Sequence, residues 1–466
     1  MTNATEQLEK GKILPLVFRL TIPAVIAQLI TFLYNVVDRA FVAKIPVSGM
    51  DALAALGIVL PVTLILSAFA GLIGNGGAPR ASVKLGEGNE AEAGRIFNTC
   101  FMMLAVAGTV IGAITFGLAE PVVRVFGCPE SAVAFATDYL KIYAIGTVFV
   151  TLSQGLNPFI TAQGYAFTAM LSVLIGALLN IALDPLFIFV LNMGVKGASL
   201  ATVLSQAVSF VYIILFLFSK KNGLRLNVKS MRPEKARVFS VLSLGISPFI
   251  MTITECAIQI VFNVNLNAST GGDSNYTAAL TIMLSALQLI SLPLNGLGYG
   301  MQPFVSYNYG KGDAKRLKTG IRYVTAIAFA FVLIVWSASV LFPEIYAYAF
   351  SASDEVTAIV VAYAPSFLMG SVMFFVQMTL QNVNVALGQA KSALIIAVFR
   401  KVVVLIPLCF ALTHFMGFAG VYLSEGLADL LAGVVTAVAL SITFPKVIGK
   451  RVAEVADKTT APGESR

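Results

Sequence analysis

The chain has 466 residues, of which 58% are hydrophobic and only 12% are charged, and its formal net charge is +8. This composition excludes an ordinary soluble domain, and the mean hydropathy of +0.87 predicts an integral membrane protein. The four cysteines show no CxxC or other metal-binding spacing and lie mostly in or beside apolar runs, so we interpret them as small hydrophobic residues.

Apolar stretches long enough to cross a bilayer, about 20 residues each, recur along nearly the whole chain. The first follows the polar segment MTNATEQLEKGK. It is too long for a signal-peptide core and has no small-residue cleavage pattern, so we expect it to be retained. The sequence predicts twelve transmembrane helices, over residues 14–43, 52–80, 94–119, 132–155, 163–192, 196–218, 239–267, 276–304, 317–342, 357–385, 391–413 and 417–444.

Two of the predicted helices carry a stripe of polar side chains at helical spacing, which places each set on one face of an otherwise apolar rod. The first helix has a stripe that we expect to line a cavity, formed by Gln28, Thr31, Asn35 and Asp38. The seventh helix has a corresponding stripe, formed by Thr252, Glu255, Gln259 and Asn263. The carboxylate lies near the outer end of the first helix and near the middle of the seventh. The two helices therefore share a pattern and differ in chemistry.

The loops between the predicted helices differ in charge. Most lysines and arginines lie at the termini or in alternate loops, the richest being KKNGLRLNVKSMRPEKAR (220–237) and KGDAKRLKTGIR (311–322). The opposite loops hold few cations and several acids, such as Glu344 and Asp354. The positive-inside rule places the basic loops and both termini in the cytoplasm. The net charge thus reflects membrane topology, and we do not expect nucleic acid as a partner.

An internal repeat relates the two halves of the chain. The segment GNGGAPRASVKLGEGNEAEAG (74–94) resembles GYGMQPFVSYNYGKGDAKR (298–316), and Pro79 aligns with Pro303 at the same offset that pairs other landmarks. Because each half has six helices, both halves cross the membrane in the same direction. We predict an N-terminal lobe over 1–218, a cytoplasmic basic linker over 219–237, a C-terminal lobe over 238–445 and a cytoplasmic tail over 446–466.

The sequence resembles the multidrug and toxic compound extrusion (MATE) transporters, more closely their bacterial multidrug members. The resemblance rests on IPAVIAQLITFLYNVVDRAFVAK (22–44), the two repeated loops and NIALDP (180–185), and it covers nearly the full length. It implies an all-α integral membrane fold, with twelve transmembrane helices in two six-helix lobes related by a parallel repeat.

A candidate ion site lies in the N-terminal lobe. Counted from the helix ends, Asp38, Asp184 and Thr202 lie at one depth, and Asn180 is one turn from Asp184. Carboxylate, amide and hydroxyl oxygens suit Na+, and two nearby carboxylates equally suit a shared proton. The family resemblance implies Na+ or H+ binding at these four positions. Pro185 leaves the carbonyl of Ile181 without its usual donor, which provides a further ligand or a bend.

The C-terminal lobe allows two interpretations. Glu255, Glu425 and Asp429 lie at a depth comparable with Arg400 and Lys401, so one interpretation is a structural ion-pair network in which the two cations neutralise the acids. The alternative is an ion or substrate-cation site at Glu255, Asp429 and Gln259. Some MATE members use acids on helices seven and ten, but helix ten here has no acid, so Asp429 would have to take that role.

We expect a secondary active antiporter of the bacterial inner membrane, a monomer that exports amphipathic, cationic organic compounds in exchange for Na+ or H+. It would need no cofactor beyond the coupling ion. A lipid-linked saccharide flippase would need a cationic cavity, and only Arg39 and Arg400 are obvious candidates for one. A membrane-embedded enzyme is disfavoured by the lack of HExxH and GxSxG motifs, and a channel by the two-lobe repeat.

Overall fold

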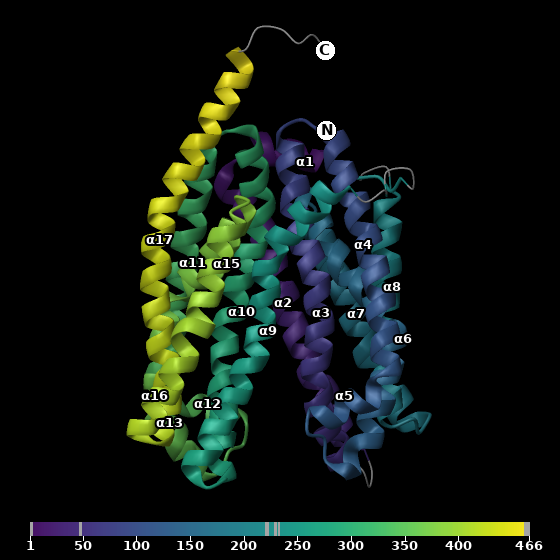
Figure 1. The fold of residues 1–466 in the computed structure, drawn as a ribbon, viewed down its shortest axis with the longest axis vertical. Coiled ribbons are helices and arrows are strands. Elements are labelled where there is room, and N and C mark those ends of the chain that lie inside the picture. The colour runs from purple at the N-terminus through teal and green to yellow at the C-terminus, as the bar shows by residue number, and fades with distance from the viewer. Residues whose placement is uncertain (1–2, 46–48, 220–222, 228–230, 232–233, 461–466) are drawn as a thin grey trace. The chain divides into compact units, whose positions relative to one another are not determined.

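The computed structural model describes residues 3–45, 49–219, 223–227, 231 and 234–460 (Figure 1). Parts of the predicted linker (220–222, 228–230 and 232–233) and the end of the predicted tail (461–466) lie outside the described residues. Within the described part of the chain, all regular elements are helices, and they form twelve spans that are long and apolar enough to cross a membrane. The predicted all-α fold and the predicted number of spans are therefore confirmed.

The first six spans alternate with short connections. They are α2 (Ile13–Ala43), α3 (Gly49–Gly86), α4 (Glu90–Gly117), α6 (Glu130–Ala162), α7 (Ala166–Pro185) with its π-helical continuation η1 (Leu186–Val190), and α8 (Val195–Leu217). Two short helices, α1 (Asn3–Lys10) and α5 (Ala119–Val125), accompany them. Positive-φ glycines such as Gly88 and Gly164 terminate helices of this half, because only glycine adopts that conformation without strain.

The last six spans are less regular. Four of them are the single helices α9 (Lys235–Thr270), α10 (Ser274–Lys311), α11 (Ala314–Leu341) and α17 (Phe418–Thr460). The tenth span is segmented into α13 (Asp354–Leu368), η3 (Met369–Met373), η4 (Phe375–Leu380) and α14 (Gln381–Ala386). The eleventh is segmented into α15 (Ala390–Val398), η5 (Phe399–Leu405) and α16 (Ile406–Met416). The short α12 (Glu344–Ala349) precedes α13. Of these segments, η4 and η5 are π-helical and η3 is a 3₁₀ helix.

Several helices extend past the predicted spans. Helix α3 runs to Gly86 and α17 runs to Thr460, beyond the ends at 80 and 444 that hydropathy predicts. Hydropathy marks only the part of a helix suited to hydrocarbon, and a helix continues into water where its residues favour helix and its side chains find partners. In α17 the Arg451 guanidinium donates to the carbonyls of Tyr309 (3.1 Å) and Gly310 (2.7 Å), which lie at the end of α10.

The chain forms two compact units. Unit 1 comprises Met1–Lys10 and Ile26–Thr252, and unit 2 comprises Gly11–Val25 and Ile253–Arg466. Helices α2 and α9 therefore each contribute to both units. Their prolines, Pro23 and Pro248, lie a few residues before the positions where the unit assignment changes. The lobe and linker boundaries given above stay a prediction.

Glycines on neighbouring helices allow the first part of α9 and the first part of α2 to pack closely. In unit 1, a Cβ atom on Gly76 of α3 would lie 2.3 Å from the carbonyl oxygen of Val241 in α9. In unit 2, a Cβ atom on Gly300 of α10 would lie 2.6 Å from Cα of Thr21 in α2. Gly76 and Gly300 correspond to each other in the repeat. The repeat read from the sequence thus reappears as the same close helix contact in each unit.

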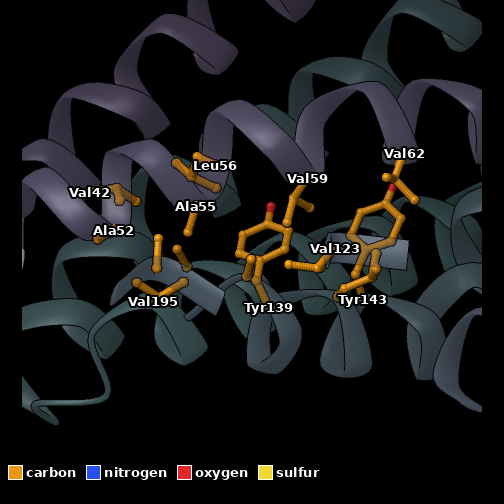
Figure 2. Close-up of a cluster of buried hydrophobic side chains, with 14 of the residues drawn as sticks. Val42, Ala52, Ala55, Leu56, Val59, Val62, Val123, Tyr139, Tyr143 and Val195 are labelled. Carbon is orange, nitrogen blue, oxygen red and sulfur yellow. The ribbon is translucent and has the colours of Figure 1, made fainter. Parts of the chain in front are cut away.

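The core of unit 1 surrounds two tyrosines of α6. The rings of Tyr139 and Tyr143 stack with centroids 6.3 Å apart, and they lie among valines of α3 that include Val59 and Val62 (Figure 2). Further along α6, Gly155 provides a close contact, because a Cβ atom there would lie 2.3 Å from a methyl carbon of Leu104. This packing fixes α6 against α3 and α4, and it holds Tyr139 in a buried position near the polar residues described next.

Candidate functional site

A fully buried carboxyl group lies near the end of α7. The Asp184 side chain has no exposed surface, and Asn180, one turn earlier, is only 2% exposed. The Asn180 Nδ2 atom donates to Asp184 Oδ1 (3.3 Å) and to Thr202 Oγ1 of α8 (3.4 Å). The three polar side chains from two helices therefore form one connected group.

The carboxyl group of Asp38 joins this group from α2. Its side chain is within hydrogen-bonding reach of the Asp184 carboxyl group. Two ionised carboxylates that lie close together repel each other, and a shared proton or a nearby cation relieves that repulsion. The structure thus brings together Asp38, Asn180, Asp184 and Thr202, the four residues that the sequence singles out for the coupling ion, although their role remains a prediction.

Three oxygen atoms of this group have no hydrogen-bond donor among the described residues. They are Asp38 Oδ1, Asn180 Oδ1 and Asp184 Oδ2, and each atom is buried. A buried acceptor without a donor costs about 1–3 kcal/mol, more when charged, unless something else satisfies it. Oxygen atoms with free lone pairs are also the ligands that a hard cation prefers. The arrangement is therefore suited chemically to a proton or to Na+.

The tyrosines beside the site were not among the sequence-based candidates. The Tyr139 side chain lies close enough to Thr202 to interact with it, and the Tyr139 carbonyl accepts from Ser199 Oγ of α8 (2.8 Å). Tyr34 of α2, one turn before Asp38, lies near enough to interact electrostatically with it. The signal that could have revealed Tyr34 is its spacing of four residues before an intramembrane acid.

The polar stripe on α2 mostly bonds its own helix. Thr31 Oγ1 donates to the Ala27 carbonyl (2.9 Å), and Asn35 Nδ2 donates to the Thr31 carbonyl (2.8 Å). Gln28, Thr31 and Asn35 are all partly exposed. The residues share the expected face of α2, and their contribution to a cavity stays a prediction.

Unit 2 contains a second polar group, formed by five charged side chains of which four are buried. Arg400 and Lys401, both under 10% exposed, lie next to each other in the π-helical segment η5. Arg400 Nη2 lies 2.6 Å from Asp429 Oδ1 of α17, and Lys401 Nζ lies 3.1 Å from Glu255 Oε1 of α9. Glu425, one turn before Asp429, lies 3.8 Å from Arg400 and 3.9 Å from Lys401.

This second group combines the two interpretations left open by the sequence. Arg400 and Asp429 form a buried ion pair, and Gln377 of η4 donates to the carbonyl of Asp429, so this part has the contacts of a structural network. Glu255, in contrast, has a side chain that is 51% exposed, and Gln259 one turn later is also exposed. Among the described hydrogen bonds, none joins Gln259 to Glu255 or Asp429.

Both polar groups adjoin π-helical turns. The fifth span does not end with α7 at Pro185 but continues as η1, whose wider turn shows in the bond from the Leu191 N–H to the Leu186 carbonyl (2.9 Å). Segment η5 carries Arg400 and Lys401 themselves. Such turns occur often at functional sites, because an extra residue in one turn redirects the side chains around it. Pro185 explains the local backbone change at the first group, since it lacks the donor of a regular α-helix.

Comparison with known proteins identifies the family. The family model described as MatE matches residues 23–186 and 234–411. The multidrug export protein MepA of Staphylococcus haemolyticus is 28% identical over 427 residues, covering 90% of this chain and 92% of that protein. MepA of Staphylococcus aureus strain MRSA252 is 25% identical over 426 residues, with 91% and 92% coverage.

Solved structures show the same fold. An outward-facing multidrug resistance MATE transporter of the MOP superfamily superposes with a TM-score of 0.89 and 23% identity, covering 96% of this chain and 99% of that one. A MOP superfamily transporter from Pyrococcus furiosus, described as having reverse polarity of its binding pocket, has a TM-score of 0.88 and 23% identity at the same coverage. The family match spans both repeats, so this chain belongs to the MatE family and is a multi-pass membrane transporter, not an enzyme.

Proposed function

We propose that this transporter exports amphipathic organic cations in exchange for Na+ or H+, with the coupling ion bound at the four-residue group of unit 1. The observation that carries the proposal is the set of three buried acceptor oxygens without donors, on Asp38, Asn180 and Asp184. An ion that binds there neutralises two adjacent carboxyl groups. Transport is then coupled to the ion if the conformations open to the two sides of the membrane bind the ion with different affinities.

The substrate class rests on composition and on the relatives. The MepA proteins that resemble this chain are multidrug export proteins. This sequence contains 33 phenylalanines, 14 methionines and 14 tyrosines, and such side chains hold planar cations through apolar burial and cation–π contact. The two polar groups together hold five acids (Asp38, Asp184, Glu255, Glu425 and Asp429) and two bases (Arg400 and Lys401). This excess of acids favours a positively charged substrate over an anionic one.

The flippase alternative is disfavoured by the pairing in unit 2. A lipid-linked saccharide carries a pyrophosphate group, which needs cations that are free to bind it. Arg400 and Lys401 are instead within ion-pair distance of acids. One structural neighbour is described as having a pocket of reverse polarity that suggests a different function. Pocket polarity is therefore the property that should separate the two functions in this chain as well.

We place the transporter in the bacterial cytoplasmic membrane as a monomer, with both termini in the cytoplasm. The basic loops support the proposed orientation, and the bacterial origin of the MepA relatives supports the proposed membrane. Fusing a reporter that is active only in the cytoplasm to each terminus tests the orientation. Activity at both termini is expected, and activity at one terminus alone would contradict an even number of crossings.

Purified protein in liposomes tests the transport function. Ethidium movement is measured under a Na+ gradient and under a proton gradient, each imposed separately. We expect one of the two gradients to drive ethidium against its own gradient in the wild type and in Lys391→Met, which changes an exposed lysine away from both polar groups. Liposomes that accumulate no ethidium under either gradient, with the protein folded and correctly inserted, would refute the proposed antiport of organic cations.

A further inference from the structure

The charged group of unit 2 lacks one positive charge. Three carboxyl groups, those of Glu255, Glu425 and Asp429, face two cations, Arg400 and Lys401. Asp429 lies 2.6 Å from Arg400 and Glu255 lies 3.1 Å from Lys401, so each of these two acids forms an ion pair with one base. Glu425 has only the longer contacts of 3.8 and 3.9 Å to bases already engaged elsewhere.

Glu425 is also incompletely satisfied. Its side chain is 2% exposed, and among the described residues its Oε2 atom has no hydrogen-bond partner. A buried carboxylate of this kind is costly unless a cation or proton reaches it. Lys401 Nζ lies 3.9 Å from Glu425 Oε1, while its present partner Glu255 is 3.1 Å away. A small side-chain movement would therefore transfer the ammonium group from one acid to the other.

Glu255 differs from the other two acids in exposure. Its side chain is 51% exposed, whereas those of Glu425 and Asp429 are 2% and 1% exposed. Lys401, at 6%, approaches Glu255 from the buried side. An ionised carboxylate in the middle of a membrane helix does not face hydrocarbon at that exposure, so its open side faces water or a ligand. Gln259, exposed one turn later on α9, extends this polar surface.

We propose that Lys401 is a displaceable internal counter-ion: an organic cation binds Glu255 from its exposed side, and Lys401 moves to Glu425. In the occupied state each acid has its own cation, with the substrate on Glu255, Lys401 on Glu425 and Arg400 on Asp429. The charged group then carries no net charge. This inference rests on the proposed export of organic cations and assigns the position at which their charge is recognised.

The π-helical turn of η5 is consistent with this role. Arg400 and Lys401 are adjacent in sequence, yet both side chains reach acids of the same group. In a regular α-helix, neighbouring residues point about 100° apart. A π turn holds more residues per turn and so brings adjacent side chains nearer to one face. Arg400 also lies 5.1 Å from the ring of Phe374, a contact that helps to fix it while Lys401 moves.

Ethidium binding to the purified protein, followed by fluorescence anisotropy, tests the exchange. Lys401→Met frees Glu255, and we expect about five- to tenfold tighter binding, because a partly exposed ion pair no longer competes with the dye. Glu425→Gln removes the acid that would receive Lys401, and we expect about fivefold weaker binding. Lys391→Met is the matched control and should bind as the wild type does.

The double variant Lys401→Met/Glu425→Gln keeps the exchange testable if one of the single variants fails to fold. It removes one acid and one base, so the charge of the group equals that of the wild type, and we expect it to bind ethidium more tightly than the wild type. If both variants that lack Lys401 bind ethidium with wild-type affinity or more weakly, the proposed exchange is overturned. The proposed function would still stand. Absence of ethidium binding by the folded wild type would instead refute the cationic substrate, and this inference with it.

Discussion

The two buried polar groups occupy comparable halves of a repeated fold and differ in how their charge is compensated. In unit 1, neither Asp38 nor Asp184 forms an ion pair within the described residues, and oxygen atoms of both lack a donor. In unit 2, Arg400 and Lys401 lie against three acids, and the acid exposed most is Glu255. The first group thus requires a charge from outside the chain, while the second supplies most of its own. The repeat has kept the helix arrangement and let the chemistry diverge.

Asp184→Asn is the change expected to have the largest effect on this contrast. It keeps the size of the side chain and one oxygen ligand, but it removes the negative charge and the titratable proton. We expect the variant to reach the membrane and bind ethidium, while active accumulation in liposomes falls to the level seen without protein. Asp38→Asn should behave alike.

The double variant Asp38→Asn/Asp184→Asn measures whether the two acids act together. Groups that act as one unit give losses that do not add, so we expect the double variant to be scarcely worse than either single variant. Near wild-type pumping by Asp184→Asn under the driving gradient would show that the acid of NIALDP serves packing only.

The stability of unit 2 should depend strongly on its most buried pair. Asp429→Asn replaces the carboxylate that lies 2.6 Å from the buried Arg400 guanidinium by a neutral amide, and breaking such an ion pair costs about 3–5 kcal/mol. Glu255→Gln alters a half-exposed carboxylate, and we expect a loss below about 1 kcal/mol. Thermal unfolding in detergent compares the two directly. Equal and large losses would mean that Glu255 belongs to the structural network after all.

Thr202→Val should give the smallest of these effects. The substitution keeps the shape of the side chain and removes the hydroxyl that accepts from Asn180 Nδ2 at 3.4 Å. Losing a hydrogen bond of this kind costs about 1 kcal/mol, so the coupling-ion concentration for half-maximal transport should rise about fivefold. Thr202→Ser retains the hydroxyl and is the matched control. A valine variant indistinguishable from the serine variant would remove Thr202 from the coupling site.

The sequence was sufficient to predict the spans and the gathering of the unit 1 residues. Helix length and hydropathy mark α2, α7 and α8, and counting residues from helix ends places Asp38, Asp184 and Thr202 at one depth. The π turns were not predictable, because they depend on which carbonyl each N–H finds after Pro185 or around Arg400. The partner of Glu255 was not predictable either, since the choice between Lys401 and Arg400 depends on the rotation of η5.

The long helix α17 has a consequence for watching this transporter work. Its 43 residues span about 65 Å, roughly twice the hydrocarbon thickness of a bilayer. Arg451 ties its distal part to the end of α10, so a fluorescent or spin label in the last described turn would report the orientation of α10 and α17 together. A tilt of about 10° would displace that label by about 11 Å at this length. Double electron–electron resonance between that label and a second spin label elsewhere on the transporter could resolve such a displacement without a probe near Glu255 or Asp184.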